Sequence, residues 1–203
     1  MNEQQKQWQQ DGRRAFDWIA SVYTQTSTAR ADARALFEEN EWTVLYRNMW
    51  GGDATTTILD EWPFLFLTAF CALPPGLKQT AAEGTAAVMG FFFYDSKREG
   101  PQCFAGTVRW SNPEAELDHW MLYYALGGPG SHDKQFERSG DGIRTARPTE
   151  EGRRWKPGVE EVKWFEVPLS TITSAERIND VVAAAQSMVR GDEAPAKKIL
   201  ASL

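Results

Sequence analysis

Two β-rich runs joined by a short polar link constrain the fold of this chain more than any other feature of its sequence. Thr85–Tyr94 and Gln102–Trp110 are rich in aromatic, β-branched and small apolar residues. The link of about seven residues between them is polar and ends in a Gly-Pro pair, as turns often do. Strand-forming runs on either side of such a link pair as antiparallel neighbours. The sequence therefore predicts a hairpin over about 85–110.

Helical patterns lie near the N-terminus. Over residues 2–24, apolar side chains recur near one face of an otherwise Gln-rich segment, which predicts a helix. Gly12 falls inside this pattern and can split the helix. A second helix is predicted over about 28–40, with Ser27 or Thr28 as its cap. The beginning of the chain is therefore expected to supply two N-terminal helices.

The strongest helical pattern lies near the C-terminus, over about 174–190. Apolar residues keep one face of this segment to about Arg190. Thr173 and Glu176 are three residues apart, as in a capping box, and Gly191 is placed to end the helix. A short helix is expected to follow over about 196–202.

Other segments complete the expected fold. Residues 161–167 alternate in the manner of a strand, and Pro168 ends them. Phe64–Ala72 and Leu117–Leu126 are apolar runs that periodicity alone does not assign to helix or strand. Helices at both ends of a mainly antiparallel sheet predict an α+β fold.

Residues 127–158 form the least regular part of the sequence. They hold seven glycines, three prolines and many charged residues, and they predict a long polar loop rich in Gly, Pro and Arg. A loop of this length in a compact domain is usually functional or disordered. Its glycines match neither a phosphate-binding loop nor a dinucleotide fingerprint. The whole chain, 1–203, is expected to form a single domain around this loop.

The balance of residue types favours binding over catalysis. The chain has nine tryptophans, which offer large buried or contact areas, but only two histidines and two cysteines. Cys71 and Cys103 lie in apolar contexts and are expected to be buried thiols. Their number and spacing fit neither a zinc site nor a disulfide framework, so neither a metal nor a cofactor is expected.

The net charge of −6 argues against a nucleic-acid partner, which would select a basic face. The longest apolar stretch, residues 62–73, is too short to span a membrane, and the first residues carry no apolar signal region. These features predict a cytoplasmic protein without a membrane association. A protein partner with a basic surface would complement the acidic charge.

The tryptophans divide by their sequence context, and this division supplies the candidate contact residues. Apolar neighbours predict core positions for Trp18, Trp62, Trp110 and Trp164. Polar, glycine or charged neighbours favour surface positions for Trp8, Trp50, Trp120 and Trp155. Because Trp and Arg dominate binding hot spots, the candidates for partner binding are Trp50, Trp120, Trp155, Arg144 and Arg147.

One short pattern supports a catalytic alternative. Glu161 and Lys163 flank a single residue on a predicted strand, so their side chains are expected on the same face. Together with an upstream Asp141 or Asp118, they would form the kind of site in which metal-dependent nucleases hold magnesium and activate water. The alternative function is therefore a metal-dependent hydrolase or nuclease.

In size, acidic charge and composition, the whole chain resembles the small immunity proteins that bacteria make against their own toxins, and also phage-encoded inhibitors of host defence. The resemblance involves no shared motif and therefore carries over no site residues. It implies a non-enzymatic protein that binds and blocks another protein. A small-ligand module with an aromatic pocket is a third possibility.

Overall fold

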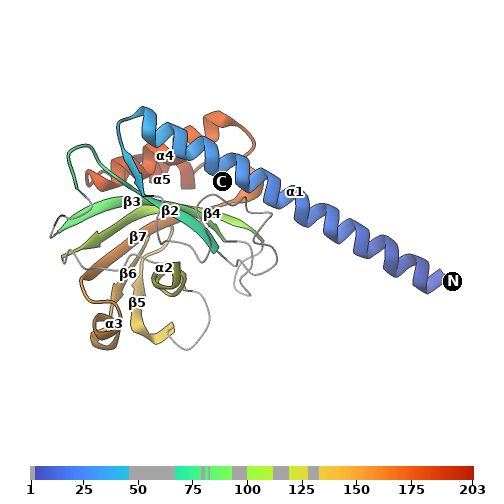
Figure 1. The fold of residues 1–203 in the computed structure, drawn as a ribbon, viewed down its shortest axis with the longest axis horizontal. Coiled ribbons are helices and arrows are strands. Elements are labelled where there is room, and N and C mark those ends of the chain that lie inside the picture. Colours follow the sequence, from blue (N-terminus) through green and yellow to red (C-terminus); the bar gives the residue numbers. More distant parts are fainter. Residues whose placement is uncertain are drawn as a thin grey trace.

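The computed structural model describes most of the chain and places one antiparallel sheet at its centre (Figure 1). Helices lie against both faces of this sheet, which confirms the α+β fold predicted from the sequence. The described residues are 3–45, 67–78, 81, 83–92, 100–111, 119–127 and 133–203.

The sheet has seven strands in the order β1-β2-β3-β4-β7-β6-β5, and every neighbouring pair is antiparallel. The predicted hairpin is β3 and β4, which pair from Gly84 with Trp110 to Phe92 with Gln102. The predicted strand at 161–167 is β7, and it lies beside β4. The strands are β1 (Thr43–Leu45), β2 (Leu67–Leu73), β3 (Gly84–Phe92), β4 (Gln102–Trp110), β5 (Phe136–Ser139), β6 (Arg144–Pro148) and β7 (Val159–Pro168).

Helices cover the two faces of the sheet unequally. Figure 1 shows α1, α4 and α5 on one side, and α2 and α3 on the other. One buried cluster joins α1, α4 and α5 to the sheet, and a second cluster joins α2 to the opposite face. The helices are α1 (Glu3–Glu39), α2 (His119–Ala125), α3 (Glu150–Trp155), α4 (Ala175–Val189) and α5 (Ala194–Leu200).

Strand β7 contributes side chains to both buried clusters. Val162 and Trp164 belong to the cluster under α2, whereas Phe165 and Val167 belong to the cluster under α4. Successive side chains of a strand point to opposite faces, so a strand covered on both sides needs apolar residues at both parities. The alternation predicted for this segment is confirmed.

The structure assigns the two apolar runs that periodicity left open. In the described part of the first run, residues 67–72 belong to β2, which lies between β1 and β3. In the described part of the second, residues 119–125 form α2, whose Met121, Leu122 and Ala125 are fully buried against the sheet. Tertiary packing therefore decides between helix and strand where the sequence is apolar on all sides.

The two helices predicted at the start of the chain are one, and this prediction was wrong. Helix α1 runs without a break from Glu3 to Glu39. Gly12 does not interrupt it, because a glycine inside a helix costs only about 1 kcal/mol relative to alanine and leaves the hydrogen bonding intact. Ser27 and Thr28 therefore lie in the middle of a helix and do not cap one.

The long polar loop expected at 127–158 is also corrected where the structure describes it. Residues 136–139 and 144–148 form the hairpin β5–β6, and β6 pairs with β7. Phe136, Ala146 and Pro148 are buried, although their neighbours are polar. These strands are held by hydrogen bonds to an existing sheet edge, which composition does not reveal.

Helix α4 confirms the C-terminal helix and moves its cap by one residue. Ser174, and not Thr173, accepts a hydrogen bond from the backbone N–H of Arg177, at 3.2 Å. At the other end, Gly191 has a φ of 84°, and its N–H donates to the carbonyl of Met188. A left-handed glycine after the last turn is a common helix ending, so the predicted stop is confirmed.

Both cysteines are free and fully buried, as predicted. Cys71 belongs to the cluster under α2, and Cys103 to the cluster under α4, so the sheet separates them. Burial raises the pKa of both thiols far above its ordinary value. A thiol that does not ionise is a poor nucleophile, and these two side chains act as small apolar residues.

We expect Gly106→Ala to destabilise the sheet. A Cβ at this position of β4 would overlap the carbonyl oxygen of Lys163 and the Cα of Trp164 in β7, neither of which can rotate away. The expected loss is about 2–3 kcal/mol in the free energy of unfolding, measured by urea denaturation. Gly12→Ala is the control, because nothing lies within 4 Å of its added Cβ. Equal midpoints for the two variants would refute this account of Gly106.

Candidate functional site

The N-terminal half of α1 extends away from the rest of the molecule (Figure 1). We call residues 5–21 the arm. Within the arm, every residue is exposed except Gly12 and Ile19, which are partly exposed. At about 1.5 Å per residue, the arm is about 25 Å long. Because most helical stability in proteins comes from packing one face, a helix this exposed over such a length would be marginal by itself.

Large apolar side chains are exposed on this arm. Trp8 is 75% exposed, Phe16 is 59% exposed and Trp18 is 57% exposed. The surface position predicted for Trp8 is confirmed, whereas the core position predicted for Trp18 is wrong. The apolar neighbours of Trp18 are Phe16, Ile19 and Ala20, which belong to the same arm and not to the core.

A regular stripe connects the arm to the packed half of α1. Spacings of four and three residues alternate along it from Trp8 to Ala33, as in the seam of a coiled coil, and a last step of four reaches Phe37. Its members on the packed half are buried or half-buried, whereas along the arm Trp8 and Ala15 are exposed and Gly12 is partly exposed. The stripe consists of Trp8, Gly12, Ala15, Ile19, Val22, Thr26, Ala29, Ala33 and Phe37.

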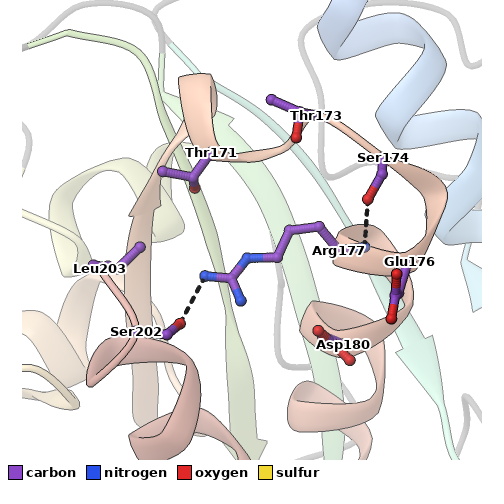
Figure 2. A pocket seen from close by; sticks show the side chains of 8 residues that line it. All are labelled: Thr171, Thr173, Ser174, Glu176, Arg177, Asp180, Ser202 and Leu203. Atoms are coloured by element: carbon purple, nitrogen blue, oxygen red, sulfur yellow. Dashed lines mark hydrogen bonds between the residues drawn. The ribbon is translucent and has the colours of Figure 1, made fainter.

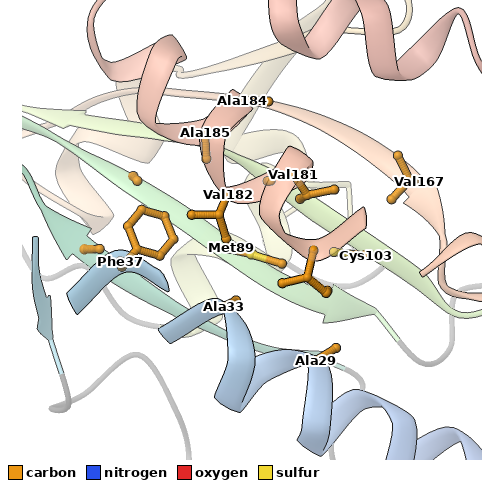
Figure 3. Packing of buried hydrophobic residues seen from close by; sticks show 14 of the residues in the cluster. Ala29, Ala33, Phe37, Met89, Cys103, Val167, Val181, Val182, Ala184 and Ala185 are labelled. Atoms are coloured by element: carbon orange, nitrogen blue, oxygen red, sulfur yellow. The ribbon is translucent and has the colours of Figure 1, made fainter. Parts of the chain in front are cut away.

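The packed half of the stripe lies against α4 and the sheet. Figure 3 shows Ala29, Ala33 and Phe37 of α1 facing α4 and the sheet. Phe37 meets Phe70 of β2 edge to face, with the ring centroids 5.7 Å apart. The side-chain amide of Gln25 donates to the carbonyl of Ile172, at 2.9 Å, near the point where the arm leaves the body. The same helical stripe is therefore a packing surface wherever a partner covers it.

The residues of the catalytic alternative lie on one face of a strand, and the described contacts do not gather them into a metal site. Glu161 and Lys163 alternate on the same face of β7, and each has an ion-pair partner. Arg147 donates to Glu161 at 2.6 Å, and Lys163 donates to Glu193 at 2.9 Å. Among the described residues, no three His, Cys, Asp or Glu side chains converge as a metal site requires.

Asp141 lies near Lys163, but no contact among the described residues places the two in a catalytic arrangement. Both residues line one shallow pocket with Glu193 and Lys197, and Asp141 accepts the backbone N–H of Gly142 at 3.0 Å. Asp118, the other upstream aspartate, lies outside the described residues. The hydrolase alternative therefore stays a prediction.

The predicted contact residues do not gather into one described surface. Trp155 is half-buried, with its ring packed edge to face on Tyr124 at 5.7 Å. Arg144 pairs with Glu166 at 3.3 Å, and Arg147 is held by Glu161. Trp50 lies outside the described residues, as does the side chain of Trp120. The described candidates therefore serve the packing and ion pairing of the β6–β7 side.

A pocket of about 410 Å³ lies where α4 begins and the chain ends (Figure 2). Arg177 crosses it and donates to Ser202 at 3.2 Å. The backbone N–H of the same Arg177 is capped by Ser174. With Glu176 and Asp180 also lining it, the pocket is polar and not aromatic, unlike the ligand pocket of the third sequence hypothesis.

Sequence reasoning missed the arm because it treated residues 2–24 and 28–40 separately. The signal was present in the alternating spacing of Trp8, Gly12 and Ala15, which continues unbroken through Thr26 and Ala33. Reading both segments in one register would have shown a single stripe.

Comparison with known protein families, with characterised proteins and with solved structures found no match to this chain. In the described part of the chain, no helix combines the length and the apolarity that a bilayer crossing needs.

We expect Glu193→Gln to weaken the attachment of α5 to β7 in a pH-dependent way. Hydrogen bonds from Lys163 and then Lys197 hold the pKa of Glu193 below its ordinary value of 4.5. A lowered pKa stabilises the folded state above that value, and the gain is lost as the pH falls through the folded pKa. The variant should lose roughly 0.5–1 kcal/mol at pH 7 and clearly less at pH 3.

Urea denaturation at the two pH values measures this difference. Glu150→Gln is the control, because its pair with Arg154 is highly exposed and should leave the unfolding midpoint unchanged. An equal loss for Glu193→Gln at both pH values would contradict the ion-pair account.

Proposed function

We propose that this protein acts by binding a protein partner, without catalysis, and that the arm of α1 is its contact surface. The observation that carries the proposal is the stripe of α1, which is a packing seam on one half of the helix, whereas on the arm Trp8 and Ala15 are exposed and Gly12 and Ile19 are partly exposed. Tryptophan is enriched in binding hot spots, and helices commonly bind by laying an apolar face against a partner.

The spacing of the stripe indicates what kind of partner surface fits. Alternating steps of four and three residues mesh with another helix, whose side chains fill the holes between successive turns. The partner therefore supplies a helix with an apolar seam. The role that best fits such binding, given the acidic chain and its many tryptophans, is that of an inhibitor or immunity-type protein that blocks its target.

A photoreactive aromatic residue in place of Trp8 tests this proposal in cells that carry the gene. We expect it to form discrete covalent adducts with protein, visible as bands of defined mass. The same residue in place of Gln10, which is exposed on the other side of the helix, is the matched control and should form few adducts. Equal labelling from both positions, or no protein adduct from Trp8, would overturn the proposal.

A further inference from the structure

The charges along the arm narrow the choice of partner. The arm, residues 5–21, carries two acidic and three basic residues, so its net charge is only +1 although the whole chain has a net charge of −6. A surface built for a basic protein would carry acidic excess, and one built for an anionic membrane would carry a larger basic excess. The charged residues are Lys6, Asp11, Arg13, Arg14 and Asp17.

We propose that the partner of the arm is the arm of a second copy of this chain, in an antiparallel helix pair with its two-fold axis near Gly12. This inference rests on the proposed function and names the partner. The second copy supplies what the stripe requires, namely an exposed helix with the same spacing of four and three residues. Two-fold symmetric pairing is the commonest form of self-association.

Gly12 is suited to the centre of such a pair. It lies on the stripe midway between Trp8 and Phe16, and a Cβ there would meet nothing within 4 Å. Without a side chain, two helices can approach closely at this point. An axis at Gly12 sets Trp8 of one copy level with Phe16 of the other, because each lies four residues from the centre. Trp8 of each copy then covers Phe16 of the other.

The charged flank of the stripe is complementary to itself. Asp11 and Arg14 lie one turn apart on the same side, with their charged groups 4.0 Å apart. A two-fold axis at Gly12 sets residue 11 of one copy level with residue 13 of the other, so Asp11 lies within about 1.5 Å of axial rise of Arg14 of the other copy. The two Asp11 side chains lie about 3 Å apart along the axes, where the two arginines offset their repulsion. The pair therefore gains two reciprocal ion pairs, and the register is specified by charge as well as by shape.

The exposed aromatic area suits a reversible dimer. Trp8 and Phe16, which each bury about 150–250 Å² when covered and are now 75% and 59% exposed, supply roughly 400–700 Å² over two copies. Specific interfaces bury about 1,200–2,000 Å² in total, so the aliphatic and polar parts of the arm bring the pair to the lower end. Association is therefore expected to depend on protein concentration.

Sedimentation of the purified full-length chain over about a hundredfold range of concentration tests the pairing. We expect a shift from monomer to dimer, with Trp8→Ala weakening the dimer on the order of a hundredfold because two copies of a hot-spot residue are lost. Gln10→Ala is the control and should leave the dimer constant unchanged. A monomer at every concentration would overturn the inference.

A charge exchange tests the proposed register. Asp11→Arg and Arg14→Asp each place like charges together, and each should weaken the dimer about tenfold. The double variant restores the reciprocal pairs and should regain the wild-type dimer constant. A different protein would not carry the exchanged charges, so the double variant would not regain its binding to such a partner. If the double variant does not recover the wild-type dimer constant, the proposed register is wrong.

Engineered cysteines test the antiparallel orientation. Gly12→Cys lies on the two-fold axis and should form a disulfide between copies under mild oxidation. Ala15→Cys should not, because its two copies lie about 9 Å apart along the helix axes, beyond disulfide reach. Both native cysteines are buried and should not compete. Efficient linkage at both positions would indicate a parallel pair and overturn the proposal.

Failure of this inference can be told apart from failure of the proposed function. A monomeric chain whose Trp8 photoprobe labels a different protein keeps the function and rejects the second copy. A monomeric chain whose arm labels no protein rejects both. A monomeric chain that binds neutral phospholipid vesicles through Trp8 rejects both in favour of a membrane surface.

Discussion

The central strands of this sheet are apolar on both faces, and the rest of the structure follows from the need to cover them. In β7, Val162 and Trp164 point to one side and Phe165 and Val167 to the other, and all four are buried. Burial at both parities requires a layer of helix on each face. Helices α1, α4 and α5 supply one layer and α2 contributes to the other, so the distribution of helices is a consequence of the strands.

The need to cover the sheet also explains why one half of α1 is packed and the other half is exposed. Its stripe is longer than the surface it packs against, since Ala29, Ala33 and Phe37 are buried whereas Trp8 and Ala15 are exposed. A helix that kept only the packed half would satisfy the core. The additional turns continue the stripe to Trp8, with Phe16 and Trp18 exposed beside it, and the proposed partner outside the body would cover them.

The ion pairs of the β6–β7 side give the polar residues a structural role. Arg147 with Glu161 and Lys163 with Glu193 tie neighbouring elements together around strands whose apolar faces are already satisfied. Each carboxylate is thereby matched by a cation, which is the arrangement of a solvated strand face. These ion pairs give Glu161 and Lys163 a structural role, and the hydrolase function suggested by their spacing stays a prediction.

Strong periodic patterns determined several elements by themselves: the β3–β4 hairpin, the alternation of β7 and helix α4 with Gly191 after it are local, because turn chemistry and side-chain spacing need no distant partner. The exposed position of Trp8 was likewise visible in its polar context. Tertiary structure decided the rest. Strands β5 and β6 depend on the edge of β7, the continuity of α1 overrides Gly12, and Trp18 is exposed because the body ends before it. Sequence specifies which face of a helix is apolar, but only the arrangement of the other elements determines how far along the helix that face is covered.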